Sequence, residues 1–304
     1  MYRLISFRVA FITLTLFALP LLGQPRPRGV DGFRSEIRLQ GFHFGNFFQA
    51  SDSALEENVR AAGVEYRGAW RPQSSVTDFY GHASYLDYSG LDRKDSYAAR
   101  LGLAHFGSVH EFNAFADRAE NRATFDVGDT TALANVTTLS ANYGFRVTPN
   151  WQLGAEGTHE RQRFDVITGR ENDYNAFGGS VRYRGFGRMF SPEIGFTRGD
   201  RDVRDERESY DEDTWYARAI MNPTSRVYLS VRYRDRTRDY RVSDPTAGNF
   251  GRSDDRGQWT GNLAYQFNDR VGASLYYSQE DVVSNRAGRD FGTDFFMVSL
   301  NYGF

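Results

Sequence analysis

Apolar and polar residues alternate along most of this chain, and the alternation predicts β-strands. Between Gln258 and Phe267, one set of alternate positions holds Trp259, Leu263 and Tyr265, and the positions between them are mostly polar. A period of two residues places the two sets on opposite faces of a strand. The pattern therefore predicts a sheet with one apolar face and one polar face.

Fourteen segments show this alternation, and together they cover most of the chain after residue 34. They are 35–48, 54–70, 74–88, 95–106, 109–118, 132–146, 151–164, 173–184, 189–198, 213–221, 226–238, 256–267, 271–280 and 291–304. In the first segment, Ile37 and Leu39 are out of phase with Phe42 and Phe44, which predicts a β-bulge near Gly41. The count is even, so both ends of an antiparallel arrangement would return to the same side.

The breaks between the segments are alternately short and long. The short breaks are 71–73, 107–108, 148–150, 185–187, 222–224 and 268–269. The long breaks are 49–53, 89–94, 119–130, 165–171, 199–210, 239–255 and 281–290. Tight turns at one end and long loops at the other are typical of transmembrane barrels. We therefore expect an all-β fold, an antiparallel up-and-down transmembrane β-barrel of about fourteen strands. A soluble sandwich or propeller is the alternative, but neither sorts its connections by length.

The last strand supports the barrel. Its apolar face ends the chain and consists of Phe296, Val298, Leu300, Tyr302 and Phe304. An alternating strand that ends in an aromatic residue resembles the assembly signal of bacterial outer-membrane β-barrels. The resemblance implies recognition by the barrel-assembly machinery, contact with outer-membrane lipid, and residence in the cell outer membrane.

The composition excludes several classes of protein. The chain is 40% hydrophobic with a mean hydropathy of −0.60, too polar for a bundle of membrane-spanning helices. Its net charge of −2 argues against nucleic acid as a partner. It has no cysteine, and therefore neither disulfides nor an N-terminal lipid-bearing cysteine. Trp70, Trp151 and Phe267 lie next to short breaks, where an aromatic girdle is expected.

The N-terminal segment predicts export. Residues 1–23 read as a cleaved signal peptide, with Arg3 and Arg8 before an apolar run that ends at Gly23. A membrane anchor is the alternative, but an apolar run of about 14 residues is short for a span. Residues 24–34 would then form a flexible periplasmic lead-in, and residues 35–304 would form the barrel.

Charged residues on the polar face should point into the lumen, since a charge facing lipid costs about 2 to 4 kcal/mol. The predicted pore-lining residues are Glu65, Arg67, Asp78, His82, Arg100, Glu111, Asp117, Arg146, Glu156, Glu160, Arg182, Arg184, Glu193, Arg218, Arg232 and Arg234. Acidic residues dominate the fifth and seventh strands, and arginines dominate the eighth, tenth and eleventh. This separation resembles general diffusion porins. The alternative is that neighbours pair, for example Glu193 with Arg182 or Arg218, and fill the interior.

Chemistry beyond a pore has little support in the sequence. One cluster combines a nucleophile, two bases and an acid, namely His105, Ser108, His110 and Glu111. It spans a predicted periplasmic turn, so we expect no catalytic residues there. The acidic segment 199–213 does not follow the spacing of calcium loops and is expected to be a solvated loop. The sequence predicts no metal site and no cofactor.

These patterns favour a porin-like barrel, and we expect a monomer that lets small hydrophilic solutes diffuse passively through its charged lumen. A structural barrel with a filled lumen, such as a sheath for a partner protein, is the first alternative. An outer-membrane lipid hydrolase or protease is the second alternative.

Overall fold

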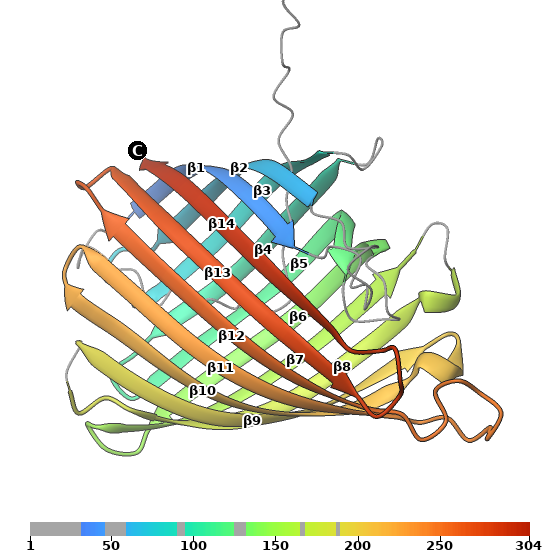
Figure 1. Cartoon of the computed structure of the whole chain (residues 1–304). Helices are drawn as coiled ribbons and strands as arrows, with labels where there is room; N and C mark the ends of the chain where they lie inside the picture. Colours follow the sequence, from blue (N-terminus) through green and yellow to red (C-terminus); the bar gives the residue numbers. More distant parts are fainter. Residues whose placement is uncertain (1–31, 46–58, 90–94, 125–131, 165–167, 187–188) are drawn as a thin grey trace, which may run out of the picture.

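In the computed structural model, which describes residues 32–45, 59–89, 95–124, 132–164, 168–186 and 189–304, the chain forms a closed antiparallel barrel of fourteen strands (Figure 1). The strands are β1 (Gly32–Gly45), β2 (Val59–Arg71), β3 (Thr77–Ser89), β4 (Ser96–Phe106), β5 (His110–Thr124), β6 (Ala132–Arg146), β7 (Trp151–Arg163), β8 (Asn172–Tyr183), β9 (Phe190–Val203), β10 (Tyr210–Thr224), β11 (Val227–Tyr240), β12 (Ser253–Gln266), β13 (Val271–Ser284) and β14 (Phe291–Gly303). Within these described ranges, two short 3-10 helices, η2 (Thr168–Arg170) and η3 (Glu206–Glu208), lie in the connections. The predicted fold class and strand number are confirmed.

The first and last strands close the barrel. β1 pairs with β14 from Glu36 opposite Gly303 to Gly45 opposite Asp294. The backbone nitrogen of Phe304 donates to the carbonyl oxygen of Ser35 at 3.0 Å, so the last residue also takes part in the closure. A closed sheet leaves no unpaired strand edge to face lipid.

The predicted bulge near Gly41 is wrong. The pairing of β1 with both neighbours runs without a register shift on either side of this residue. Phe42 instead points into the barrel, where it is 6% exposed and its ring centroid lies 6.0 Å from that of Phe295. The apolar residues of β1 therefore move from the outward positions at Ile37 and Leu39 to the inward position at Phe42, because the Phe42 ring packs on Phe295 inside the barrel and the backbone stays regular. The signal peptide and most of the lead-in lie outside the described residues, and β1 begins three residues before the predicted barrel start.

Most strands reach further toward the long connections than predicted. β9 continues to Val203 and β10 begins at Tyr210, so most of the predicted loop 199–213 is strand. On these extensions the outward positions are acidic, as at Asp200, which lies opposite Asp211 in the register. The outer surface is polar here because it projects beyond the lipid, and the apolar signal of a transmembrane strand is lost.

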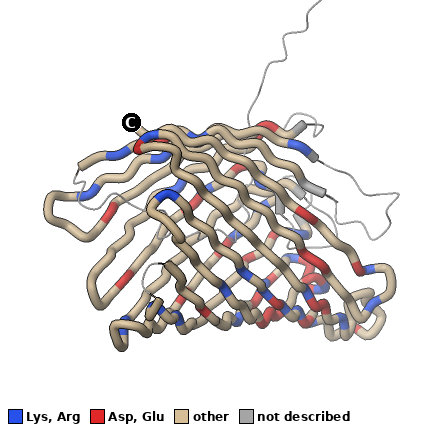
Figure 2. The backbone as a smooth tube through the Cα atoms, turned by 60° about the vertical axis from the view of Figure 1, so that its left-hand side comes forward, with Lys and Arg blue, Asp and Glu red and all other residues tan. Residues whose placement is uncertain are grey.

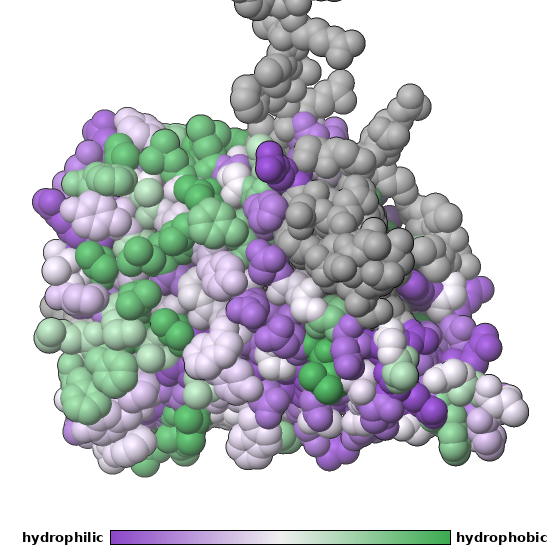
Figure 3. Space-filling view, viewed as in Figure 1, coloured by the Kyte–Doolittle hydropathy of each residue, from purple (hydrophilic) through white to green (hydrophobic). Residues whose placement is uncertain are grey.

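The outer surface between these extensions and the short turns is apolar (Figure 3). Leu101, Phe177 and Ile194 are each more than 60% exposed, which is favourable only where lipid covers them. Aromatic pairs mark the boundary of this belt on the side of the long connections, for example Tyr233 and Trp259, whose ring centroids lie 4.8 Å apart. No helix in the described ranges is long and apolar enough to cross a membrane, a finding that concerns helices alone.

Candidate functional site

All sixteen charged residues predicted to line the lumen lie at inward-facing positions of the wall. Strand alternation places them there, because their neighbours along each strand face outward and are more exposed. Contacts between distant strands bear out the inward direction, as when Arg184 at the end of β8 reaches Glu111 on β5. Their role in conduction stays a prediction, and the contacts below divide them into separate clusters.

The first cluster joins β2, β3, β4 and β5. Glu65 and Asp117 are almost fully buried, and His82 lies between them, with one ring nitrogen 3.5 Å from Glu65 and the other 3.9 Å from Asp117. The arginine partners and their distances are Arg67 to Glu65 (2.8 Å), Arg100 to Asp117 (3.1 Å) and Arg122 to Asp117 (3.5 Å). Each of the two buried carboxylates therefore has arginine partners from the wall itself.

A second group of ion pairs lies near the short turns. Glu111 accepts hydrogen bonds from Arg146 and Arg184, both at 2.6 Å, and from the side-chain amide of Gln152 at 3.1 Å. Asp78 pairs with Arg71 at 2.6 Å and with Arg34 at 3.3 Å. Two of these four carboxylate–arginine links, Arg184 to Glu111 and Arg34 to Asp78, connect strands that are not neighbours, and the other two connect paired strands.

The third cluster is centred on Glu193 of β9. Its carboxylate lies 2.6 Å from both Arg182 and Arg218, the pairing that the alternative interpretation of the sequence expected. The hydroxyl of Tyr216 donates to Glu193 and lies at the same distance, 3.2 Å, from Glu156.

A glycine makes room for that tyrosine. A Cβ at Gly195 would lie 2.3 Å from Cζ of Tyr216, so a side chain at this position is incompatible with the ring as it stands. The tyrosine therefore lies flat across the wall, and one face of its ring is covered by the guanidinium of Arg232, 4.3 Å from the ring centroid.

A fourth cluster, near the long connections, contains residues that the sequence analysis did not select. Toward the end of the barrel away from the C-terminus, acidic and basic residues are dense (Figure 2). The ion pairs there include Arg201 with Glu160 (3.5 Å), Arg238 with Glu212 (2.6 Å), Arg236 with Glu280, and Arg252 with Asp254 (2.7 Å). Most of these residues lie in predicted loops or at predicted strand ends. Extending the inward phase of Arg232 and Arg234 by two more steps would have found Arg236 and Arg238.

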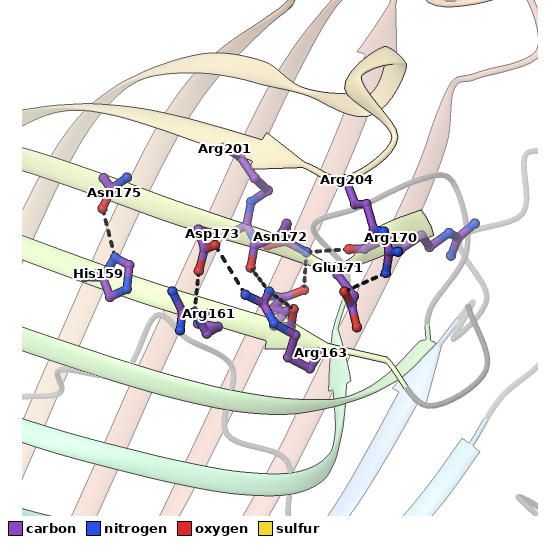
Figure 4. Close-up of polar contacts among 11 residues, drawn as sticks. His159, Arg161, Arg163, Arg170, Glu171, Asn172, Asp173, Asn175, Arg201 and Arg204 are labelled. Atoms are coloured by element: carbon purple, nitrogen blue, oxygen red, sulfur yellow. Dashed lines mark hydrogen bonds and ion pairs between the residues drawn. The ribbon is translucent and has the colours of Figure 1, made fainter. Parts of the chain in front are cut away.

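The two faces of the wall are distinct even at this polar end (Figure 4). On the outer face, Nε of Arg161 donates to Asp173 at 2.7 Å, and Nδ1 of His159 lies 2.8 Å from the side-chain oxygen of Asn175. On the inner face, Arg201 donates to Asn172 at 2.6 Å. Asp173 and Asn172 are adjacent in sequence, so polar character alone does not tell which face a residue occupies here.

Outside the strands, local hydrogen bonds set the ionisation of the acidic connection around η3. Hydrogen bonds from the Arg207 side chain lower the pKa of Asp205 below its usual value. Burial raises the pKa of Glu208. As the pH falls, Glu208 is therefore protonated before Asp205.

A cavity of about 230 Å³ lies inside the barrel against β5 to β11. It extends from Glu111 and Gln152, near the short turns, to Glu160 and Arg238, near the long connections. Its lining includes seven arginines and five glutamates, so the wall carries a surplus of positive charge. The remaining lining is largely hydroxyl, amide and small side chains, which suits water and hydrated solutes.

The structure does not bring the histidine cluster together as a catalytic site. His105 and His110 are on the outward phase, where Nδ1 of His105 lies 3.0 Å from the Thr77 hydroxyl and Nδ1 of His110 lies 2.6 Å from the Tyr143 hydroxyl. Glu111 is on the inward phase and is held by arginines. The wall therefore separates the acid from both bases. Among the residues placed by the structure, no group of three or more His, Cys, Asp or Glu is arranged to hold a metal ion.

A scan against protein-family models found no match, and neither did a search of curated proteins. Among solved structures, a TodX monoaromatic hydrocarbon channel with its S2 segment deleted is similar, at 11% identity and a TM-score of 0.52 over 93% of each chain. A bacterial polysaccharide outer membrane secretin is similar at 10% identity and a TM-score of 0.50, over 89% of this chain and 98% of that one.

In-vitro folded OmpT, an outer membrane protein of Vibrio cholerae, matches at 10% identity and a TM-score of 0.44, over 91% of this chain and 99% of that one. At such identities the likeness concerns the fold. The closed wall and its apolar outer surface are those of a transmembrane β-barrel, the fold that this chain shares with the TodX and secretin structures.

Proposed function

We propose that this barrel is a passive channel for small hydrophilic solutes. The observation that carries the proposal is the polar cavity, which follows the inner wall from the short-turn end to the long-connection end. A lining of charged and hydroxyl groups replaces part of the hydration shell of a polar solute and offers nothing to an apolar one. The solute path lies against β5 to β11, and the buried cluster around Asp117 forms the fixed opposite part of the interior.

The chain's other features fit this role. Residues 1–23 direct export, the C-terminal strand with Phe304 engages the assembly machinery, and the barrel works as a monomer in contact with outer-membrane lipid.

A sheath barrel with a filled lumen is the second candidate. It is favoured by the burial of ion pairs such as Arg252 with Asp254, both 2% exposed or less.

Conductance in planar bilayers tests the proposal. The refolded full chain should give discrete current steps, and Ser140→Trp, which places a large ring in the cavity lining, should lower the step size. The matched control is Leu139→Trp, because Leu139 directly precedes Ser140 on β6 but faces the outer surface, where it is 51% exposed. Correctly folded protein that carries no current would contradict the channel and favour the filled barrel.

A further inference from the structure

Four arginines occupy successive inward positions of β11, and only two of them have carboxylate partners. Arg236 pairs with Glu280, and Arg238 pairs with Glu212 at 2.6 Å. No carboxylate oxygen from the described part of the chain lies within 4.0 Å of a guanidinium nitrogen of Arg232 or Arg234, the distance that defines an ion pair. Arg232 and Arg234, the half of this arginine row nearer the short turns, therefore carry charge that no described residue neutralises by direct contact.

Both of these arginines are turned toward the cavity and are poorly solvated. Arg234 is 4% exposed and donates one hydrogen bond, to the side-chain oxygen of Gln258. Its Nε, and that of Arg232, has no hydrogen-bond partner among the described residues. Both line the cavity, whose wall has more arginine than glutamate.

Two carboxylates of the cavity wall lie near Arg232: Glu193, which is held by two other arginines, and Glu156, which accepts a hydrogen bond from the Tyr216 hydroxyl. Arg218 lies directly opposite Arg232 in the register, and it shares the single carboxylate of Glu193 with Arg182. The positive charge around Arg232 is thus reinforced by its neighbour Arg218.

A buried charge without a counter-charge is unfavourable, and an anion from solution can supply the missing partner. The planar guanidinium group presents parallel N–H donors that match the two oxygens of a carboxylate or phosphate. We propose that Arg232 and Arg234 form a binding subsite for a small oxyanion within the lumen, with Arg218 strengthening the local field. This inference rests on the proposed channel function, since the anion must reach the cavity through it.

The test uses the refolded full chain in planar bilayers under a KCl gradient, with inorganic phosphate or sodium acetate added. Wild-type channels should prefer chloride to potassium, and at least one of the two oxyanions should reduce the chloride current. In the double variant Arg232→Gln, Arg234→Gln, the half-blocking concentration should rise about tenfold or more, as expected for losing charge-assisted hydrogen bonds. Block by phosphate alone or by acetate alone identifies which class of oxyanion the subsite holds.

The control is the double variant Arg161→Gln, Arg198→Gln, which removes the same charge from the outer face, where both side chains are more than half exposed. Its half-blocking concentration should equal that of the wild type. The variant Arg232→Lys, Arg234→Lys keeps the charge but loses the planar fork, and it should weaken block less than the glutamine pair. Heat-modifiable migration in gels checks that each variant is folded.

The two proposals fail in different ways. Current through the wild type that is insensitive to both oxyanions, or to the loss of both arginines, overturns the subsite and leaves the channel standing. If the folded wild type carries no current, the channel proposal fails. Calorimetric titration with phosphate and acetate then decides the subsite: binding that is lost in the glutamine variant supports it, and no binding overturns it.

Discussion

Among single residues, Glu193 illustrates how the inner wall is held. Its carboxylate pairs with both Arg182 and Arg218 and accepts a hydrogen bond from Tyr216, while only 5% of its surface is exposed. A buried ion pair gives little net stability over an apolar equivalent, but removing one partner leaves an uncompensated charge. The importance of such a residue therefore shows on deletion of its charge.

The substitution Glu193→Gln should lower the free energy of unfolding by about 3 to 5 kcal/mol, because it leaves two arginines, each with a side chain only 15% exposed, without a counter-charge. Urea unfolding of the barrel in lipid vesicles measures the change. Asp173→Asn is the control, since Asp173 pairs with an Arg161 side chain that is 53% exposed and should contribute at most about 1 kcal/mol. Equal losses in both variants would contradict the assignment.

For single residues, the sequence predicts which face of the strand a side chain occupies better than it predicts which residue the side chain contacts. Alternation places Arg184 and Glu111 on the inner face of their strands, and the structure agrees. It cannot tell that these two residues meet, because they are 73 positions apart and their contact depends on the shear and curvature of the whole wall. For the same reason, only the folded barrel shows that no described carboxylate pairs with Arg232 or Arg234.

At the scale of a strand, β11 passes through two environments. Its outward residues are Val227, Leu229, Val231 and Tyr233 at the short-turn side, followed by Asp235. The aromatic pair of Tyr233 and Trp259 lies at the change, as expected for the boundary of the hydrocarbon layer. The strand continues past this boundary with water on its outer face.

Two arginine substitutions on this face should separate the environments. Val231→Arg places a charge in the apolar belt and should cost about 2 to 4 kcal/mol of folding free energy in lipid vesicles. Asp235→Arg, four residues further along the same face, should cost no more than about 1 kcal/mol. If the two costs were alike, the boundary would not lie at Tyr233.

The sequence predicts the number of strands and the short turns because lipid imposes an apolar phase that water beyond the membrane does not. Where β9 and β10 project past the belt, both faces are polar, so the segment around Asp200 and Asp211 looks like a loop. Phe42 shows the opposite difficulty, since an inward aromatic residue has the same composition as an outward one and the phase alone suggests a bulge.

The last strand makes a prediction about assembly. Deleting Phe304 removes the backbone hydrogen bonds that its amide and carbonyl form with Ser35, as well as the terminal ring. We expect much less folded barrel in the outer-membrane fraction, with unchanged conductance for the molecules that do assemble. Phe304→Ala keeps the backbone bonds and loses only the ring, so it separates closure from the aromatic signal. Normal insertion of the shortened chain would contradict this role.

On the scale of the whole molecule, the two ends of the barrel differ. One end has the short turns, the C-terminus and aromatic residues such as Trp151 at the edge of the apolar belt next to these turns. The other end has projecting polar strands, long connections and the dense charge of the fourth cluster. In barrels of this fold the short turns face the periplasm and the long loops face outward, which would put the polar extensions at the cell surface.

Surface labelling tests this orientation, and the absence of cysteine from the chain makes the experiment clean. Thr246→Cys lies in the exposed connection between β11 and β12 and should react with a membrane-impermeant maleimide on intact cells. Asn150→Cys lies in the exposed short turn before β7 and should react only after the outer membrane is permeabilised. The opposite labelling pattern would show that the barrel has the inverse orientation. Arg232 and Arg234, the arginines of β11 nearer the short turns, would then lie toward the cell surface.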